Sequence, residues 1–157
     1  MKYSIDTSGL LDGWVRYYPP DLFPSLWDGR FDELIEEGRL IATEEVLIEL
    51  EKKEGDAVHA WAQKRSALFV PVDEPIQACV TDLLAQYPYL AAEQSRRSSA
   101  DPFVIALAQI EGCAVVTGEH PSNNLKKPKI PDVCADQGIL CLGLPQVFRE
   151  EGWVFRT

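Results

Sequence analysis

Short apolar segments alternate along this chain with longer segments of helical pattern, and this alternation limits the fold more than any other feature. The apolar segments are rich in residues that favour strands, and turn-forming residues separate them from the helical segments. Parallel strands joined by right-handed helical crossovers form a sheet that is covered on both faces. The pattern therefore predicts an α/β protein, a three-layer α/β/α sandwich with a central parallel sheet. We expect its strands at residues 3–5, 40–42, 68–72, 114–117 and 139–142.

The helices expected between these strands follow from apolar spacing and from the turn and capping residues at their ends. They span residues 9–17, 21–37, 44–53, 56–66, 74–86, 103–111, 132–137 and 145–151. The 157 residues contain no internal repeat and no linker that would divide them. We therefore expect one domain over residues 1–157.

The formal net charge of −10 limits the partners that the chain can bind. Nucleic-acid binders are usually basic, so that role requires local basic clusters or intervening metal ions. The four cysteines lack the spacing of a zinc site and are expected to be free thiols in a reducing compartment. No signal peptide and no membrane-spanning segment is expected, so the predicted location is the cytoplasm.

A carboxylate, Asp6, ends the first expected strand. The carboxyl ends of parallel strands are where α/β proteins hold their active sites. Glu49 lies on the helix after the second strand, Asp101 begins the helix before the fourth strand, and Glu119 follows that strand. The sandwich could bring these four acidic residues together.

Such a cluster of carboxylates requires protons or cations to offset its charge. Two like charges 4 Å apart repel by about 4 kcal/mol at an effective dielectric constant near 20. Hard oxygen ligands of this kind select Mg²⁺ or Mn²⁺, and these ions also bring an anionic phosphate to an acidic protein. The cluster therefore indicates a divalent-metal site suited to phosphodiester hydrolysis.

Several motifs, taken in order, resemble the PIN-domain nucleases. They are the N-terminal I-D-T-S, the helical V-x-x-E-L, the helix start A-D-P-F-V-I-A-L-A, and V-V-T-G-E after the fourth strand. The segment K-I-P-D-V-C-A-D-Q-G-I and the R-E-E-G-W ending look like a prokaryotic subfamily related to VapC-type toxins, so the resemblance covers nearly the whole chain.

The resemblance implies a strand order of 3-2-1-4-5 and a metal site at the carboxyl edge of the sheet. It also implies an Mg²⁺- or Mn²⁺-dependent endoribonuclease that acts as the toxin of a toxin–antitoxin pair. The expected partners are an RNA substrate, a cognate antitoxin protein and a second copy of the chain in a homodimer. The expected catalytic and metal-binding residues are Asp6, Glu49, Asp101 and Glu119.

The family more often has Asp at the fourth acidic position, where this chain has Glu119. Asp132 and Asp136 lie within reach of the same loop and are alternative ligands. Each of the other acidic residues also has a structural explanation: a strand-end turn at Asp6, a solvated helix position at Glu49, and a helix N-cap at Asp101.

Other polar residues are expected to support the site. The hydroxyl residues Thr7, Ser8 and Thr117, together with Asp132, would orient the metal ligands. Two basic groups flank the expected site and could either contact a phosphate backbone or form solvated loops. They are Arg96 and Arg97, and Lys126, Lys127 and Lys129. The two histidines, His59 and His120, are expected at the surface.

Two other functions compete with a nuclease. The chain could be a non-catalytic PIN-like binding module, which would be expected to have lost acidic positions. It could also be a metal-dependent phosphatase or phosphotransferase, because a strand ends at Asp6. That chemistry usually needs a second Asp two residues further on, where this chain has Ser8.

Overall fold

A computed structural model describes residues 1–53, 56–90 and 100–156 of the chain. Five parallel strands form one sheet in the order β3-β2-β1-β4-β5. The predicted α/β class and the strand order implied by the resemblance are both confirmed. The strands are β1 (Tyr3–Ile5), β2 (Leu40–Thr43), β3 (Phe69–Val70), β4 (Ala114–Val116) and β5 (Cys141–Leu142).

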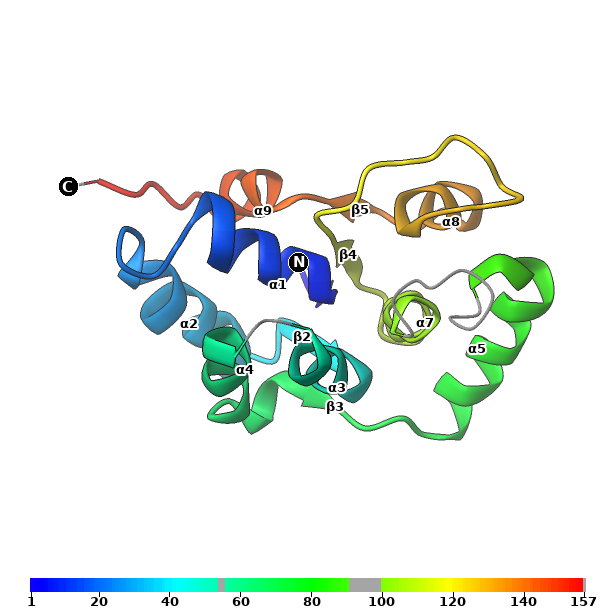
Figure 1. The fold of residues 1–157 in the computed structure, drawn as a ribbon, viewed down its shortest axis with the longest axis horizontal. Coiled ribbons are helices and arrows are strands. Elements are labelled where there is room, and N and C mark those ends of the chain that lie inside the picture. Colours follow the sequence, from blue (N-terminus) through cyan, green and yellow to red (C-terminus); the bar gives the residue numbers. More distant parts are fainter. Residues whose placement is uncertain (54–55, 91–99, 157) are drawn as a thin grey trace.

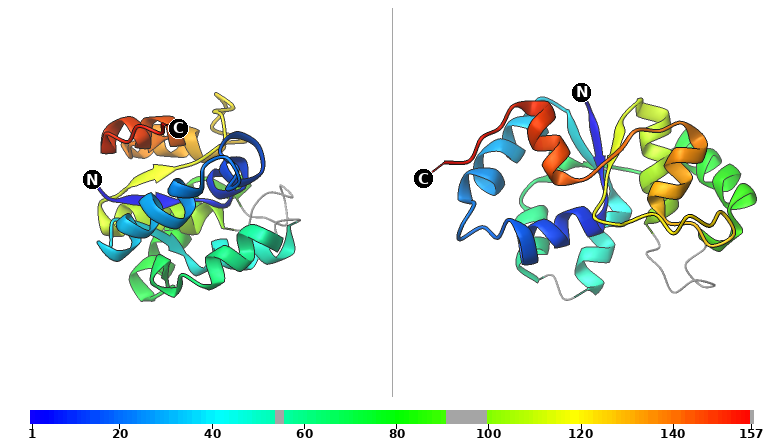
Figure 2. Two further views of the ribbon diagram at one scale, coloured as in Figure 1. Left: turned by 90° about the vertical axis from the view of Figure 1, so that its left-hand side faces the viewer. Right: turned by 90° about the horizontal axis from the view of Figure 1, so that it is seen from above.

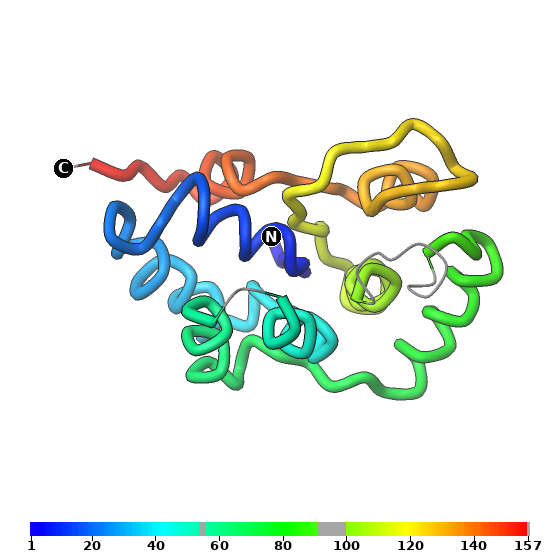
Figure 3. Tube along the Cα trace, in the orientation of Figure 1, coloured from blue at the N-terminus to red at the C-terminus, as the bar shows by residue number. Residues whose placement is uncertain are grey.

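Helices cover both faces of this sheet, as Figures 1 and 2 show. On one face lie α1 (Thr7–Asp12), α2 (Phe31–Glu36), α4 (Asp56–Gln63) and α9 (Leu144–Glu151). On the other face lie α5 (Glu74–Gln86), α7 (Asp101–Glu111) and α8 (Ile130–Gln137). Helix α3 (Glu44–Lys52) follows β2 at the carboxyl edge of the sheet. The change of face occurs because β1 is central and the chain moves outward from it in both directions (Figure 3).

Several helices differ from their expected bounds. The segment 21–37 begins with a turn, in which Leu22 and Phe23 donate to the carbonyl of Pro19, so the helix starts at Pro24. It continues as a π-helical turn, η2 (Leu26–Arg30), into α2. Short 3₁₀ turns, η3 (Ser66–Leu68) and η4 (Pro88–Leu90), precede β3 and follow α5. The spacing of apolar residues does not indicate where backbone hydrogen bonds join residues five apart, so the π-helical turns were not predicted.

The first helix also ends in a π-helical turn, η1 (Gly13–Tyr17). Its widened geometry is shown by the hydrogen bond from the amide of Tyr18 to the carbonyl of Gly13, 2.8 Å long. Glycine at position 13 allows a close approach, because a Cβ there would lie 2.8 Å from Cδ1 of Leu144 and 3.3 Å from Trp27 and would force these side chains to shift. The turn therefore packs directly against α9 and the aromatic core.

The core joins the sheet to an aromatic cluster. Tyr3 and Ile5 of β1 are fully buried, as befits a central strand. On the face of α1, Trp27 contacts Phe31 and Trp61 edge-on, with ring centroids 5.1 Å apart in each pair. Burying one such side chain contributes about 1.5–3 kcal/mol, so this cluster fixes α2 and α4 against the sheet.

The amino edge of the sheet is fastened by an ion pair. The guanidinium of Arg39, just before β2, donates to Oε2 of Glu151 at the end of α9 over 2.5 Å. The Tyr3 hydroxyl donates to the same oxygen over 2.5 Å. These contacts tie α9 to β1 and to the start of β2. No helix in the described parts of the chain is long and apolar enough to cross a membrane.

Candidate metal centre

Three acidic side chains meet at the carboxyl edge of the sheet. Asp6, Asp101 and Glu119 each present a carboxylate oxygen, and these three oxygens lie within 4.8 Å of one another. The residues come from the end of β1, the start of α7 and the loop after β4, so only the folded sheet brings them together. A group of oxygen atoms at this separation has the chemistry of a site for a hard divalent cation.

Asp6 is held rigidly because it also caps α1. Its backbone is extended, and its Oδ1 accepts a hydrogen bond of 2.7 Å from the amide of Gly9. Thr117 donates to Oδ2 over 2.8 Å. The Ser8 hydroxyl lies 2.9 Å from each of the two carboxylate oxygens. The carboxylate is thus oriented by donors from the first turn of α1 and from the residue that follows β4.

The pKa of Asp6 is raised to about 7, chiefly because burial disfavours its ionised form. The hydrogen bonds from Gly9, Thr117 and Ser8 act in the opposite direction, and the charge of Glu119 raises the pKa further. In the described part of the chain, no Lys or Arg forms an ion pair with either Asp6 or Glu119. A bound cation would supply the compensating charge, so the residues fit a divalent metal ion.

The loop after β4 is fitted closely around Ser8. The Ser8 hydroxyl accepts from the amide of Gly118 over 3.0 Å and lies 3.1 Å from the Thr117 hydroxyl. A Cβ at position 118 would lie 2.3 Å from Oδ2 of Asp12 and 3.0 Å from the carbonyl of Ser8. Glycine is therefore required at this position for the loop to approach α1.

Asp101 is buried in the first turn of α7. Its interpretation as an N-cap was wrong: Ala100 is the N-cap residue, and Asp101 and Pro102 are the first two helical residues. A carboxylate in the first turn is favoured by the helix dipole.

Glu49 is buried beside this group without being one of the three. Its Oε1 accepts from the Thr7 hydroxyl over 2.5 Å, and its Oε2 accepts from the amide of Ala100 over 3.2 Å. Thr7 follows Asp6 and Ala100 precedes Asp101, so Glu49 links the two chain segments that carry those ligands. It is not the solvated helix residue that its acidic neighbours suggested.

Glu119 is the most accessible member of the group and is only half-buried. Its amide donates to the Thr117 hydroxyl over 3.1 Å, and its Oε1 accepts a long hydrogen bond of 3.4 Å from the amide of Ile130. Few contacts fix this side chain, so it can adjust to a cation more readily than Asp6 can.

Asp132 has a different position from the acidic group. Its carboxylate accepts from the amides of Ser122, Asn123 and Lys129, each at 2.8 Å, and so fastens the loop between β4 and α8. These hydrogen bonds lower the pKa of Asp132 against the opposing effect of burial. Asp136 accepts from the Tyr87 hydroxyl. Of the three candidates for the fourth acidic position, only Glu119 joins Asp6 and Asp101.

The structure describes some of the basic residues that were expected near the site. Arg96 and Arg97 lie outside the described residues. Lys126 and Lys127 are exposed on the loop before α8, and Nζ of Lys127 lies 5.7 Å from the ring centre of Tyr89. Lys129 is half-buried. His120 is exposed and His59 is half-buried.

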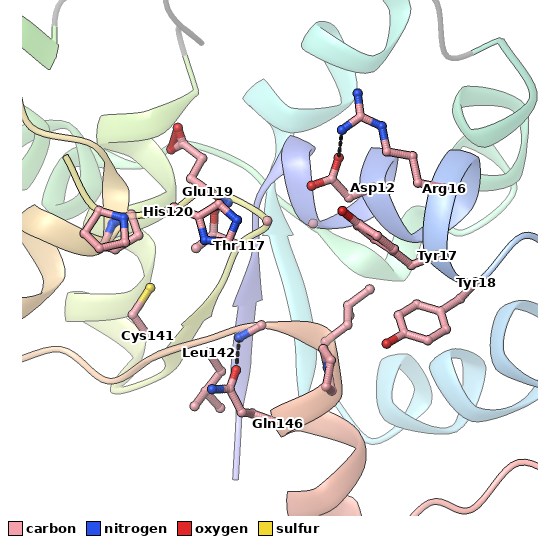
Figure 4. Close-up of a pocket in the computed structure, with 17 residues that line it drawn as sticks. Asp12, Arg16, Tyr17, Tyr18, Thr117, Glu119, His120, Cys141, Leu142 and Gln146 are labelled. Carbon is pink, nitrogen blue, oxygen red and sulfur yellow. Dashed lines mark hydrogen bonds and ion pairs between the residues drawn. The ribbon is translucent and has the colours of Figure 1, made fainter.

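A cleft of about 590 Å³ opens beside the acidic group, as Figure 4 shows. Glu119 belongs both to the cleft and to the acidic group, and Thr117, which donates to Asp6, also lines the cleft. The opposite wall is formed by Arg16, Tyr17 and Tyr18 at the end of the first helical segment. This wall could not be predicted from the sequence, because its proximity to Glu119 depends on the packing of η1 against α9.

The comparisons with known proteins agree with this fold. The model of the family described as "Domain of unknown function (DUF4411)" matches residues 3–155. A chain in the structure of FitAB bound to an IR36 DNA fragment is similar in fold, with a TM-score of 0.52 and 15% sequence identity. The similarity covers 90% of this chain and 94% of that chain. No curated protein matches the sequence.

Proposed function

We propose that this chain, which belongs to the DUF4411 family, is a divalent-metal-dependent endoribonuclease of the PIN-like type. The observation that carries the proposal is the meeting of Asp6, Asp101 and Glu119 at the carboxyl edge of the sheet. The strand order adds support, because it is the order that the resemblance to PIN-domain nucleases implies.

In this proposal Asp6, Asp101 and Glu119 hold Mg²⁺ or Mn²⁺ directly. When bound, such an ion would polarise the phosphodiester, favour ionisation of a water molecule and offset the charge that develops on the leaving oxygen. The protein contributes orientation: Thr117 and Ser8 fix the Asp6 carboxylate, and the capping bond from Gly9 fixes its backbone. Glu119, the accessible member, faces the cleft through which substrate would enter.

Glu49 is proposed as a positioning residue rather than a direct ligand. Its two oxygens already accept from Thr7 and Ala100, so it sets the distance between the segments that carry Asp6 and Asp101. Removing such support around a metal site typically costs about 10- to 100-fold in metal affinity or activity. Glu49→Gln should therefore impair cleavage less than a change in Asp6.

The biological role proposed is that of a toxin regulated by a cognate antitoxin, with the chain forming a homodimer. The resemblance to VapC-type toxins supports it, and the FitAB chain of similar fold belongs to an assembly bound to DNA. Lys126 and Lys127 are proposed to contact the RNA backbone, because both are exposed on the loop that leaves Glu119. A small antitoxin encoded beside this protein would be the expected genetic arrangement.

The decisive experiment compares Asp6→Asn with the unmodified chain in a metal-dependent RNA cleavage assay. Asparagine retains an oxygen that can cap α1, so we expect the fold to persist. Loss of the carboxylate charge should lower cleavage by more than about 100-fold. Circular dichroism and thermal unfolding of both proteins would establish that the variant is folded.

Glu51→Gln is the matched control, because Glu51 is an exposed carboxylate on the helix that carries Glu49. It should cleave RNA as the unmodified chain does. Undiminished cleavage by folded Asp6→Asn would contradict the proposal. The absence of any metal-dependent cleavage by the unmodified chain would favour the non-catalytic binding module.

A further inference from the structure

One wall of the cleft beside the metal centre contains residues that metal binding does not require. Arg16 and Tyr17 stand on this wall, across the cavity from His120 (Figure 4). Tyr17 lines the cavity and is 62% exposed, so its ring is accessible to a ligand. Its neighbour Tyr18, by contrast, packs edge-on against Phe148 with ring centroids 4.9 Å apart.

The backbone that carries Tyr17 is fixed although its ring is exposed. The amide of Tyr18 closes the π-helical turn onto Gly13, and the indole of Trp27 donates to the carbonyl of Tyr18 over 2.7 Å. Single π-helical turns are frequent at functional sites, where they change the direction of side chains. Here the turn holds Tyr17 at the cleft on a fixed backbone.

Arg16 places a positive charge on the same wall. Its only ion pair in the described part of the chain is with Asp12, at 3.8 Å, and the Arg16 side chain is 68% exposed. An exposed pair of this kind contributes little to stability. The guanidinium can therefore turn to an incoming phosphate at small cost, which matters in a chain whose net charge is −10.

The size of the cleft limits what can enter. Its volume of about 590 Å³ falls among those of pockets that enclose one drug-sized ligand, and a nucleotide belongs to that class. A base paired within a double helix can enter such a cleft only after it has been unpaired and unstacked, which costs free energy. An aromatic face with a neighbouring cation is the combination by which proteins bind unpaired nucleotides.

From these observations we infer that the cleft binds one unpaired nucleotide next to the scissile bond. The base stacks on Tyr17, the phosphate pairs with Arg16, and the adjoining phosphodiester reaches the acidic group at Glu119. The inference rests on the proposed function for the identity of the substrate. It adds a second contact region that selects single-stranded RNA and fixes its register.

The test measures binding separately from cleavage. The full chain carrying Asp6→Asn, which should no longer hold the metal, is titrated against a fluorescently labelled single-stranded RNA oligonucleotide, and anisotropy reports the dissociation constant. Adding Tyr17→Ala should weaken binding by about 5- to 100-fold, the range for losing one stacked base. Tyr17→Phe keeps the ring and should bind as the parent does. Val154→Ala removes an equally exposed apolar side chain outside the cleft and serves as the control.

Arg16 is tested through salt dependence. If Arg16 neutralises one phosphate, Arg16→Ala should reduce the slope of log affinity against log salt concentration by about 0.7. Arg30→Ala is the matched control, because Arg30 is also on the surface in an ion pair but lies outside the cleft. Annealing the RNA to its complement should weaken binding by about 10-fold or more, since a paired base must first be unpaired and unstacked to enter the cleft.

The outcomes separate this inference from the proposed function. Unchanged affinity of Tyr17→Ala, an unchanged salt slope for Arg16→Ala, or equal binding of duplex RNA would overturn the inference, even if the unmodified chain cleaves RNA. No binding by the parent would overturn it too. Binding that depends on both side chains, without cleavage by the unmodified chain, would uphold the subsite and contradict the nuclease.

Discussion

At the amino edge of the sheet Glu151 accepts hydrogen bonds from Arg39 and Tyr3, whereas at the carboxyl edge Asp6 accepts only from neutral donors. The pKa of Glu151 is lowered, because its hydrogen bonds with Arg39 and Tyr3 outweigh the effect of burial. The pKa of Asp6 is raised to about 7, because burial outweighs its hydrogen bonds. Glu151 is already paired with the cation of Arg39, whereas the ionised form of Asp6 would be stabilised by a cation bound from solution. We therefore assign stability to the amino edge and metal binding to the carboxyl edge.

The largest expected effect is on cleavage at the carboxyl edge. Asp101→Asn should lower RNA cleavage by more than about 100-fold, because it removes a proposed metal ligand while keeping the shape of the side chain. Its free energy of unfolding without metal should change by less than about 1 kcal/mol, because one of several mutually repelling charges is lost. Cleavage rates and denaturant unfolding would be measured together. A strongly destabilised but active Asp101→Asn would reverse the assignment of the two edges.

Metal binding should stabilise the protein through the carboxyl edge alone. Mn²⁺ at about 100 times its dissociation constant should raise the free energy of unfolding by about 2.7 kcal/mol. The same addition should have almost no effect on Asp6→Asn, while Glu151→Ala should respond fully. Thermal unfolding with and without Mn²⁺ would measure this, and an equal response in all three proteins would place the metal elsewhere.

A change in the amino edge should affect stability but not cleavage. Glu151→Ala should lower the free energy of unfolding by about 2 kcal/mol, because it removes charge-assisted hydrogen bonds from a largely buried carboxylate. Glu150→Ala, which removes the exposed neighbouring carboxylate, is the control and should have little effect. Urea unfolding would give both values. If Glu151→Ala abolished cleavage in the folded protein, the two edges would not be independent.

The pH dependence of stability should differ in sign between the two edges. Folded Asp6 without metal keeps a proton that the unfolded chain releases above about pH 4, so its contribution is lost as the pH rises through about 7. The slope should reach at most about 1.4 kcal/mol per pH unit, and Asp6→Asn should remove it. The lowered pKa of Glu151 gives a contribution that is present above its ordinary pKa and is lost as the pH falls through the folded value.

The Glu151 slope lies below the ordinary pKa of a glutamate, so urea unfolding between pH 2 and 5 would measure it. Urea unfolding of the metal-free protein between pH 4 and 8 would measure the Asp6 slope. A profile for Asp6→Asn that matches the unmodified chain would show that Asp6 does not titrate in this range.

The fold could be predicted from the sequence to the extent that local patterns and family resemblance define it. The strand positions and the acidic candidates Asp6, Asp101 and Glu119 lie in short motifs, and a parallel sheet gathers such motifs at one edge. The resemblance added the strand order, which alternation alone leaves open. Strands β3 and β5 are shorter than expected, because an apolar run contains no information on where pairing with the neighbouring strand ends.

The details of the site depend on contacts between distant residues, and these could not be predicted. Glu49 and Asp132 are both acidic residues near the expected site, yet one links two ligand segments and the other fastens a loop. Their roles depend on the amides of Ala100 and Ser122, which no side-chain pattern reveals. Similarly, nothing in the sequence around Tyr17 indicates a cleft, because its position depends on Gly13 fitting against Leu144.

The π-helical turn at Gly13–Tyr17 also suggests how this cleft could diversify. A turn closed between residues five apart contains one residue more than an α-helical turn. Deleting a single residue there would allow α1 to continue as a regular helix and would change the direction of the side chains within the turn. Tyr17 would then leave the cleft while Asp6, Asp101 and Glu119 stayed in place. A change in chain length, rather than a substitution, would thus change which ligand the cleft binds and leave the acidic group unchanged.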